Sequence, residues 1–419
     1  MRYLYTCLFY LALPFIFLRL LWRSRQIPGY RQGWAQRLGY CPQLEKSIWV
    51  HAVSVGETIA AVPLIKALLK AFPQVPLVVS NMTPTGAARV KELFKESVKQ
   101  IYIPYDVPSA VNRFLQRIHP QVAVVMETEL WPNLFAGCSK YHVPIVIANA
   151  RLSEKSARGY SYIPRLTRDM FLSIHSMAAQ ASADAERFIA LGLSRDKVTV
   201  TGNLKFDLEL PADLSDKSEA LQHRIGKERP SWIAASTHPG EEEIILAAHR
   251  FILEKYPSAL LILVPRHPDR FQEVAELVQK REFKMVRRSS GESCSPQVQV
   301  YLGDTMGELL LLYSVAQVAF VAGSFARVGG HNMLEPAVLQ KAIVTGPVLF
   351  NFADISQMLL DAKGMVVVHS AEELAAQVER FFADSTYCKL TGENAYQVVA
   401  ANRGALQKQL ALIQAVLMV

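Results

Sequence analysis

Cysteine is scarce in this sequence, and its few copies are scattered. Cys7, Cys41, Cys138, Cys294 and Cys388 show no paired spacing of the kind that holds a zinc ion. Such thiols suit a reducing compartment, where free cysteine packs as a small apolar side chain. We therefore predict packing roles for these cysteines and no metal site.

Motifs that define several enzyme classes are also missing. The chain has no Gly-x-x-x-x-Gly-Lys-Ser/Thr loop and no Gly-x-Gly-x-x-Gly fingerprint, which removes the main support for an ATPase or a dehydrogenase. It lacks the Gly-x-Ser-x-Gly elbow of esterases. The formal net charge is +8, yet no long Lys/Arg tract or aromatic-basic RNA motif accompanies it. We expect no nucleic-acid partner, because an anionic membrane or a phosphorylated lipid fits this charge better.

The chain does contain enough apolar sequence for two folded domains. Its apolar share is 51% against 20% charged residues, which is typical of a folded protein. Its 419 residues exceed what one hydrophobic core usually supports. Two domains of ordinary size are therefore predicted.

The N-terminus predicts a membrane anchor over residues 1–22. Residues 3–18 carry no charge, and the apolar run continues beyond Arg19 to Trp22. No small-residue cleavage site follows, so we expect the segment to be retained. Pro14 and the short uncharged run leave open whether the anchor spans the bilayer or lies in one leaflet.

Arginines are more frequent after the anchor than before it. Arg23, Arg25, Arg31 and Arg37 follow the apolar run, whereas only Arg2 precedes it. The tendency of basic residues to stay on the cytoplasmic side places the body of the protein in the cytoplasm.

From residue 47 onward, short apolar runs alternate with helical patterns. The first half contains SIWVHAV, PLVVS, QIYIP, VAVVM and PIVIA, and the second contains PSWIAAS, ALLILVP, VQVYLG, VAFVAG and KAIVTG. Apolar strands covered by helices indicate a parallel sheet buried on both faces. The predicted fold class is α/β, with two Rossmann-like domains over residues 23–210 and 211–394.

Two further segments complete the predicted organisation. Residues 207–230 lack a sustained apolar pattern and are interpreted as a linker. Residues 395–419 read as a helix that could pack back on the first domain. In open parallel sheets, ligands bind beyond the carboxyl ends of the strands, so a cleft between two such domains would be lined by strand-to-helix loops.

The loop after the first predicted strand contains Ser54, Gly56 and Glu57. Ser54-x-x-Glu57 is a capping-box pattern, and capping alone could explain both residues. In a functional interpretation, Gly56 permits close approach and Glu57 accepts a proton from an acceptor hydroxyl. The adjacent helix N-terminus favours the ionised carboxylate, which would make Glu57 a modest base.

Three more polar residues follow strands of the first half. Glu127 and Glu129 lie two apart in METELWPN and share a face only if the strand continues that far. Glu127 is the better candidate for work in the cleft, and a surface salt bridge is the alternative. Lys205 in TGNLKFD is either a solvated surface charge or a cation that neutralises a departing phosphate.

The second half repeats this arrangement. ASTHPGEEE opens a helix, with Thr237 or His238 expected near its cap. Arg266 and His267 in VPRHPDR could grip a phosphate or a base. LGDTMGELLLLY contains a second capping-box pattern, from Thr305 to Glu308.

The segment VAFVAGSFARVGGHNMLEP, residues 318–336, is the most telling. Its glycines would let the backbone approach an oxygen-rich ligand, and a following helix N-terminus favours an anion. A bound nucleotide or sugar phosphate is one interpretation. The other is that Asn332 caps the helix and Glu335 closes a capping box.

Seven motifs follow the apolar N-terminus in one order: HAVSVGE, METELWPN, NLKFD, STHPGEE, PRHPDR, DTMGELLLLY and GGHNMLEP. In this order the chain resembles the bacterial lipid A Kdo transferases, where Kdo is 3-deoxy-D-manno-octulosonate. The resemblance covers most of the chain and is weakest after about residue 360.

The resemblance implies a metal-independent, inverting GT-B glycosyltransferase that needs no cofactor. It would transfer Kdo from the donor substrate CMP-Kdo to a tetraacylated, bisphosphorylated lipid A precursor at the cytoplasmic face of the inner membrane, in lipopolysaccharide biosynthesis. Glu57 would be the general base, and Glu127 and Lys205 would stabilise the transition state. The residues implied to hold CMP are Pro265, Arg266, Met306, Gly307, Glu308, Asn332, Met333, Leu334 and Glu335. Further contacts are expected from Ser54, Gly56, His238, His267, Gly330 and His331.

Two rival interpretations remain at this point. One is a membrane-associated GT-B transferase that uses a UDP-sugar donor. The other is an anchored protein that binds a nucleotide sugar or a lipid without turnover. The sequence leaves the number of transferred Kdo residues, the acyl preference and the oligomeric state open.

Overall fold

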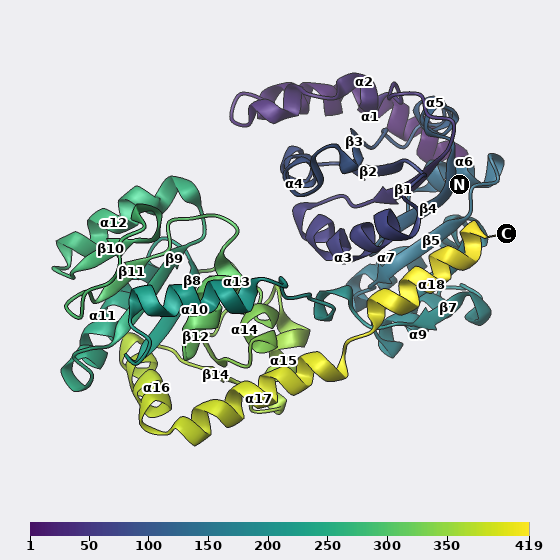
Figure 1. Ribbon diagram of the computed structural model, residues 1–419. Helices are drawn as coiled ribbons and strands as arrows, with labels where there is room; N and C mark the ends of the chain where they lie inside the picture. The colour runs from purple at the N-terminus through teal and green to yellow at the C-terminus, as the bar shows by residue number, and fades with distance from the viewer. Residues whose placement is uncertain (419) are drawn as a thin grey trace. The chain divides into compact units, whose positions relative to one another are not determined.

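The structure is a computed structural model that describes residues 1–418. It comprises two compact units, whose elements are labelled in Figure 1. Unit 1 contains Met1–Asp207 and the chain from Asn402 onward, and unit 2 contains Leu208–Ala401. Each unit holds a parallel seven-stranded sheet, which confirms the predicted α/β fold with two Rossmann-like domains.

The sheet of unit 1 has the strand order β3-β2-β1-β4-β5-β6-β7. Its strands are β1 Ser47–His51, β2 Leu77–Asn81, β3 Lys99–Tyr102, β4 Pro120–Met126, β5 Ile145–Ala150, β6 Ile174–Ala179 and β7 Val198–Val200. Its α-helices are α1 Arg2–Arg23, α2 Trp34–Arg37, α3 Val55–Ala71, α4 Pro84–Phe94, α5 Pro108–Ile118, α6 Pro132–Lys140, α7 Glu154–Ser161, α8 Pro164–Leu172, α9 Ser182–Ala190 and α18 Ala405–Leu417. Short 3₁₀ turns are η1 Pro28–Arg31, η2 Lys95–Ser97, η3 Arg195–Lys197 and η4 Leu204–Phe206.

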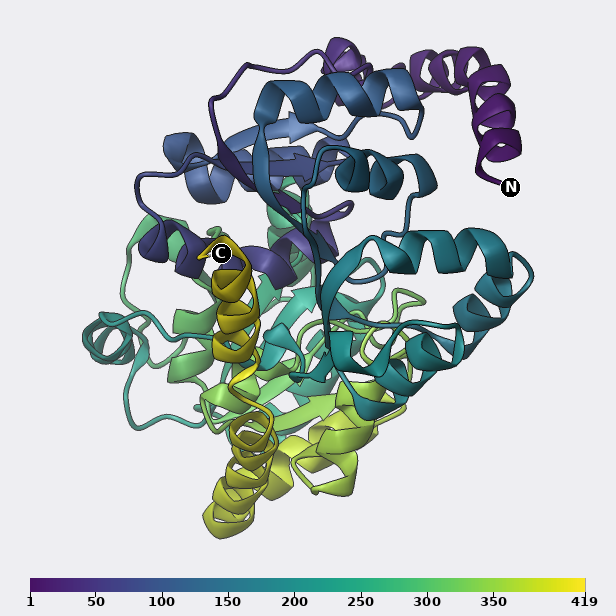
Figure 2. The ribbon, with the colours of Figure 1, turned by 90° about the vertical axis from the view of Figure 1, so that its right-hand side faces the viewer.

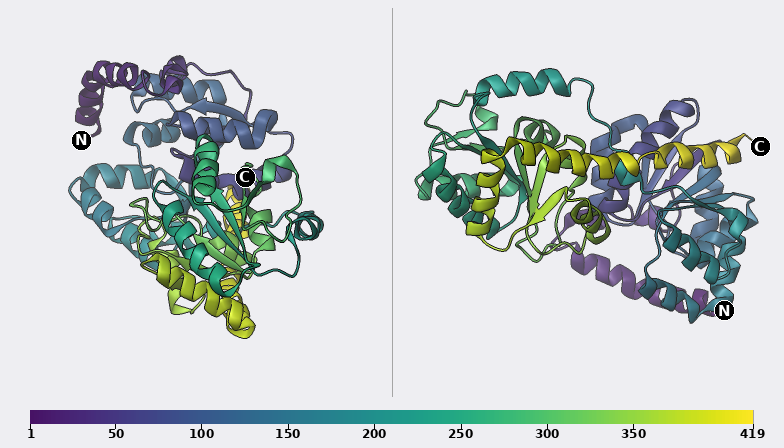
Figure 3. Two further views of the ribbon diagram at one scale, coloured as in Figure 1. Left: turned by 90° about the vertical axis from the view of Figure 1, so that its left-hand side faces the viewer. Right: turned by 90° about the horizontal axis from the view of Figure 1, so that it is seen from below.

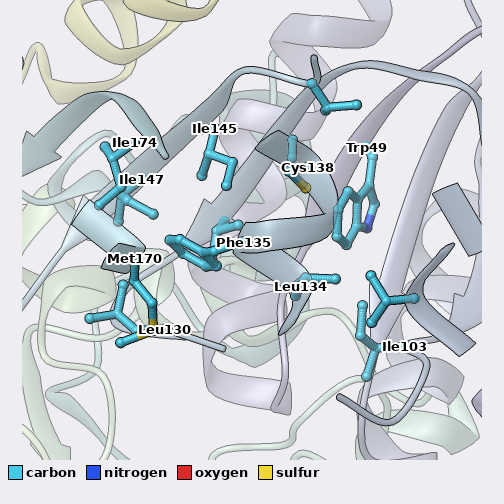
Figure 4. Packing of buried hydrophobic residues seen from close by; sticks show 14 of the residues in the cluster. Trp49, Ile103, Leu130, Leu134, Phe135, Cys138, Ile145, Ile147, Met170 and Ile174 are labelled. Atoms are coloured by element: carbon cyan, nitrogen blue, oxygen red, sulfur yellow. The ribbon is translucent and has the colours of Figure 1, made fainter. Parts of the chain in front are cut away.

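Both faces of this sheet are buried because successive strand residues point to opposite sides and both sets are apolar. Trp49 of β1 belongs to the same buried cluster as Ile145 and Ile147 of β5 and Phe135 of α6, on one face of the sheet (Figure 4). Ile48, beside Trp49 in β1, belongs to the cluster on the opposite face. This explains why the strands read as continuous apolar runs.

The sheet of unit 2 has the strand order β10-β11-β9-β8-β12-β13-β14. Its strands are β8 Ser231–Thr237, β9 Leu260–Pro265, β10 Met285–Arg287, β11 Val300–Leu302, β12 Val318–Val321, β13 Ala342–Thr345 and β14 Met365–Val367. Its α-helices are α10 Leu214–Ile225, α11 Glu241–Lys255, α12 Phe271–Lys280, α13 Leu309–Val315, α14 Leu334–Val338, α15 Ala353–Asp361, α16 Ala371–Ala383 and α17 Ser385–Ala401. Short turns are η5 Pro268–Arg270 and η6 Arg288–Ser290.

The expected linker over residues 207–230 is largely wrong, because it contains helix α10. Leu214, Leu221 and Ile225 of α10 are buried in the core of unit 2. Their spacing follows helical turns, but the many charged residues between them hide the pattern. The expected C-terminal helix over residues 395–419 is interrupted, since α17 ends at Ala401 and α18 begins at Ala405.

Helix α1 is continuous through Pro14 and is long and apolar enough to cross a membrane, by length and composition. Its inner side contacts unit 1, where Thr6 Oγ1 donates to Asn133 Oδ1 at 3.0 Å. Farther along, the ring of Phe17 lies edge-on to Tyr105 at 5.6 Å. Figure 2 and Figure 3 show α1, in purple, at the edge of unit 1. Cys7 is exposed on this helix, so its predicted packing role is wrong, whereas Cys41 and Cys138 are buried.

Candidate functional site

Several candidate residues lie where the strand order of their unit reverses. In unit 1 the order changes direction between β1 and β4, and in unit 2 it changes between β8 and β12. Loops diverge at such a point beyond the carboxyl ends of the strands, which leaves room for a ligand. Glu57 and Glu127 follow β1 and β4, whereas His238 and Gly323 follow β8 and β12.

Glu57 closes a complete capping box at the start of α3, as its spacing predicted. Its carboxylate accepts hydrogen bonds from the backbone N–H of Val53 at 2.8 Å and of Ser54 at 3.2 Å, and from the Ser54 hydroxyl at 2.8 Å. The Ser54 hydroxyl in turn accepts from the Glu57 N–H. Gly56 is exposed on the first turn of the helix.

The expectation that Glu57 is a modest base is wrong, because burial outweighs the helix N-terminus. Burial raises the pKa of Glu57 to about 7, against hydrogen bonds from Ser54 and Val53 that lower it. The negative charges of Glu129 and Glu127 raise the pKa further. A carboxylate with a pKa near neutrality is well matched to proton abstraction at physiological pH.

Glu127 begins the loop after β4, since the strand ends at Met126. Its backbone has a φ of 55°, an uncommon conformation for a residue other than glycine, and its N–H still donates to Ala148 at 2.9 Å. Burial raises the pKa of Glu127, and the positive charges of Lys205 and Arg151 lower it. These groups therefore share one electrostatic environment.

Glu129, the second acidic residue after β4, is held by a hydrogen bond from a tryptophan. Trp131 Nε1 donates to Glu129 Oε2 at 2.9 Å, and burial raises the pKa of Glu129. The structure thus settles the geometry that the sequence left open: the two acidic residues follow the strand and do not continue it.

In unit 2, Glu241 fills the backbone concavity after β12. Its carboxylate accepts from the N–H groups of Gly323 at 2.8 Å, Ser324 at 3.0 Å and Phe325 at 3.0 Å, and from that of His238 at 3.0 Å. Glu241 is only 1% exposed, so this first part of the glycine-containing loop already binds an internal anion. The N–H of Gly323 therefore already has a hydrogen-bond acceptor within the protein.

Three histidines meet beside that loop. The Nε2 atoms of His238 and His331 are 2.8 Å apart, and the rings stack at 5.0 Å. His267 approaches His238 edge-on at 5.6 Å. Burial lowers the pKa of His331 to about 3, and Arg266 and the other two histidines lower it further. At neutral pH the close nitrogen pair is thus a neutral donor and acceptor.

Gly323 and Gly329 are required by the close packing of this loop. Gly323 has a φ of 73°, and a Cβ there would lie 2.7 Å from the His331 ring. Gly329 has a φ of 103°, and a Cβ there would lie 2.5 Å from the Phe350 ring. Gly330 also has a positive φ, of 79°. The absence of a side chain at Gly323 therefore leaves room for the ring of His331, which stacks on His238.

Arg266 and His267 follow the last residue of β9, the buried Pro265, and their side chains are exposed. The loop is anchored behind them, because Arg270 donates to Glu242 Oε1 at 2.6 Å. Helix α11 begins at Glu241 with Gly240 as its cap, so His238 lies two residues before the cap and Thr237 three.

The capping box expected between Thr305 and Glu308 is also wrong. Glu308 is itself the residue before α13, and Arg288 binds its carboxylate with two hydrogen bonds of 3.0 and 2.8 Å. The Thr305 hydroxyl donates to the same carboxylate. Met306 is exposed and Gly307 has a φ of 81°, so this short loop presents its backbone to solvent.

Asn332 and Glu335 are hydrogen-bonded, but the cap differs from the expected one. Met333 is the residue before α14, while Asn332 Oδ1 accepts from the Leu334 N–H at 3.2 Å. Asn332 Nδ2 donates to Glu335 Oε1 at 3.2 Å. Burial raises the pKa of Glu335, and the positive charge of Arg266 lowers it, so these two residues interact electrostatically.

Sequence reasoning missed Glu241, Arg288 and Arg151. Glu241 is one of three successive glutamates at the start of a helix, where a favourable interaction with the helix dipole is enough to explain acidic residues. Arg288 and Arg151 follow strands with no motif around them. A search for basic residues after every predicted strand would have found Arg151, whereas Arg288 follows β10, a strand that was not predicted.

Solved structures share this two-unit architecture. UDP-GlcNAc 2-epimerase from Neisseria meningitidis, bound to UDP-GlcNAc, matches with a TM-score of 0.56 and 15% identity over 89% of this chain and 99% of that chain. A glycosyltransferase from Rickettsia africae matches with a TM-score of 0.53 and 14% identity over the same shares. Identity this low establishes the fold alone. A family model described as glycosyl transferases group 1 also matches residues 228–398. Fold and family model together define a glycosyltransferase of the GT-B class.

The particular family follows from the first unit and from full-length relatives. A family model described as 3-deoxy-D-manno-octulosonic-acid transferase (kdotransferase) matches residues 32–208. A 3-deoxy-D-manno-octulosonic acid transferase of Haemophilus influenzae is 42% identical over 99% of this chain and 98% of its own length. One from Bordetella pertussis is 35% identical over 88% of this chain and 86% of its own. The chain belongs to the 3-deoxy-D-manno-octulosonic acid (Kdo) transferase family.

Proposed function

We propose that this Kdo transferase moves Kdo from CMP-Kdo to a tetraacylated, bisphosphorylated lipid A precursor. The observation that carries the proposal is Glu57, a buried carboxylate with a pKa of about 7 in the first turn of α3, the helix that follows β1. Glycosyl transfer to a hydroxyl needs such a proton acceptor, and a binding protein without turnover does not.

The reaction we propose uses Glu57, Glu127 and Lys205 of unit 1 and no metal cofactor. Glu57 takes the proton of the acceptor hydroxyl as its oxygen bonds to the ketosidic carbon of Kdo. The bond from that carbon to the CMP phosphate oxygen breaks, and CMP leaves with the electron pair. Lys205 and Glu127 stabilise the charge of the transition state. Attack opposite the leaving group inverts the anomeric configuration.

The residues proposed to bind CMP come from three loops of unit 2. These are Pro265 and Arg266 after β9, residues 306–308 after β11, and residues 332–335 after β12. Exposed Arg266 offers a guanidinium to the phosphate, and the open backbone at Gly307 permits close approach. The carboxylate of Glu308 is already paired with Arg288 and fixes the loop after β11. The backbone of Glu308 is therefore the part that meets the ligand.

Incubation with CMP-Kdo and the lipid A precursor, followed by mass spectrometry, tests the proposal directly. We expect a product that gains one or more Kdo masses, together with free CMP. Protection against heat by CMP but not by UDP is expected in a parallel measurement, because a bound ligand stabilises only the folded state. Protection by UDP alone, with no Kdo-bearing product, would favour a UDP-sugar donor.

Helix α1 is proposed to hold the protein on the cytoplasmic face of the inner membrane, lying in one leaflet. The side turned away from unit 1 carries a continuous apolar stripe: Leu4, Leu8, Leu11, Phe15, Leu18 and Trp22, each at least 58% exposed. Their spacing of three and four residues puts them on one helix face. The first 44 residues contain six arginines and no acidic residue, which suits anionic lipid.

A spanning orientation would conflict with the contacts of the inner side of α1. The Tyr10 hydroxyl is 2.8 Å from that of Ser109, and Thr6 bonds Asn133. If α1 crossed the bilayer while keeping these contacts, polar groups of the α5 and α6 regions would enter hydrocarbon, where unpaired polar groups are costly.

Depth measurements on phosphatidylglycerol-containing vesicles distinguish the two orientations. Fluorescent labels attached to single cysteines at Leu4, Leu11 and Leu18 are expected to show similar, shallow depths. A spanning helix would instead place Leu11 deepest and put the ends on opposite sides of the bilayer. A label at exposed Lys46, outside α1, serves as the solvent-exposed control.

A further inference from the structure

The C-terminal helix α18 belongs to unit 1, and it packs against the segment that carries Lys205. It lies beside α3, β4, β5 and η4 (Figure 1). Leu406 and Ile413 of α18 share an apolar cluster with Leu204, the residue before Lys205. A helix about 200 residues away in sequence is thus part of the support of this segment.

Gln409 of α18 links β5 to the residue after β7 by hydrogen bonds, and it is 1% exposed. Its Oε1 accepts from the backbone N–H of Asn149 at 3.0 Å, and its Nε2 donates to Thr201 Oγ1 at 3.1 Å. Asn149 lies near the end of β5 and Thr201 directly follows β7, two strands separated by β6. An apolar residue at this buried position would remove the acceptor of the Asn149 N–H, and a buried N–H without a partner is costly.

The chain of hydrogen bonds continues from these partners to Lys205. Asn149 Oδ1 accepts from the Leu204 N–H at 3.0 Å, and Asn203 Oδ1 accepts from the Lys205 N–H at 3.0 Å. Leu204 and Phe206, on either side of Lys205, are buried. The backbone is therefore fixed on both sides of the lysine, which limits the directions its side chain can take.

A second link joins the far end of this segment to the same helix. Asp207 Oδ1 accepts from the Gly404 N–H and Oδ2 from the Leu406 N–H, both at 2.7 Å. A carboxylate that binds the first N–H groups of a helix is stabilised by the helix dipole as well as by the hydrogen bonds. Residues 201–207 are thus attached to α18 at both ends.

From this network we infer that Gln409 is a positioning residue for Lys205, so that the C-terminal helix serves catalysis by unit 1. The inference rests on the proposed role of Lys205 in the transition state. Gln409 acts through Asn149 and Thr201, and its loss would let the Lys205 segment shift. Small displacements of a catalytic group can reduce turnover by about 100-fold.

The test is a double-mutant cycle of Gln409→Met with Lys205→Met, measured as kcat and KM for Kdo transfer. We expect Gln409→Met alone to lower kcat by about 10- to 100-fold with KM for the donor within about twofold. In the Lys205→Met background it should cause no further loss, because the group that it positions is gone. Gln407→Met, an exposed glutamine on the same helix, should leave kcat unchanged.

Each other outcome overturns the inference in its own way. Unchanged kcat in a folded Gln409→Met variant means that the network does not position the lysine. An equal loss in both backgrounds means a general structural role. Full turnover of Lys205→Met removes the proposed function of the lysine and the inference with it. If Gln409→Met does not fold, Asp207→Asn weakens the second link and is put through the same cycle.

Discussion

Glu57→Gln is expected to fold and to bind CMP yet to lose Kdo transfer by about 10²- to 10⁴-fold, the contribution of a general base. Glutamine retains the size of the side chain and one acceptor for the backbone of the capping box. It has no carboxylate to take a proton from the acceptor hydroxyl. Turnover measured by mass spectrometry, beside CMP-dependent heat protection, separates the two properties. Near-normal turnover would exclude Glu57 as the base.

The pH dependence of the wild-type enzyme provides an independent check. A base works only when it is deprotonated, so kcat/KM should rise as the pH increases through about 7, the pKa of Glu57. The contribution of Glu57 to folding stability should change in the opposite direction, falling as the pH increases. Because burial raises this pKa above its unfolded value, Glu57 contributes stability that is lost as the pH rises through about 7.

Glu57→Gln and its control, Glu96→Gln, test this opposite dependence of activity and stability on pH. Between pH 6 and pH 8, the melting temperature of the wild type should fall relative to that of Glu57→Gln, because only the wild type must ionise a buried carboxyl. Glu96→Gln, which changes an exposed glutamate in η2, should affect neither turnover nor this trend. Loss of activity in both variants would point to a cause unrelated to proton abstraction.

Lys205→Met is expected to lower kcat by about 10²- to 10³-fold, the effect of removing one charged group that stabilises a transition state. Methionine retains the apolar stem between buried Leu204 and Phe206 but removes the ammonium group. Of the two positive charges that lower the pKa of Glu127, only that of Arg151 would then remain, so this pKa should rise. Steady-state kinetics with CMP-Kdo and the lipid precursor measure the first effect.

CMP affinity distinguishes transition-state stabilisation from ground-state binding. We expect Lys205→Met to change the heat protection by CMP much less than it changes kcat. Equal losses of affinity and turnover would show that the lysine binds the donor and does not act specifically in the transition state. Lys46→Met, which removes an exposed lysine just before β1, is the matched control for charge.

The central strands were predictable because each is an apolar run buried on both faces. The edge strands β7, β10 and β14 were not, since each has only three residues and shows partial exposure. Capping at Ser54 and Glu57 was predictable because its partners are three residues apart. The pairing of Glu308 with Arg288 was not, because it joins loops twenty residues apart.

Sequence by itself determined the α/β class, the apolar first helix and the loops that carry the family's motifs. These features depend on the periodicity of apolar residues and on partners a few residues apart, both of which can be read from the order of residues in the chain. Only the tertiary structure decided that Glu57 has a pKa of about 7, since burial depends on everything packed around the carboxyl. It also decided that Glu241 occupies the loop after β12 and that Gln409 supports the segment of Lys205. Such pairings join residues far apart in the chain, and folding alone brings them into contact.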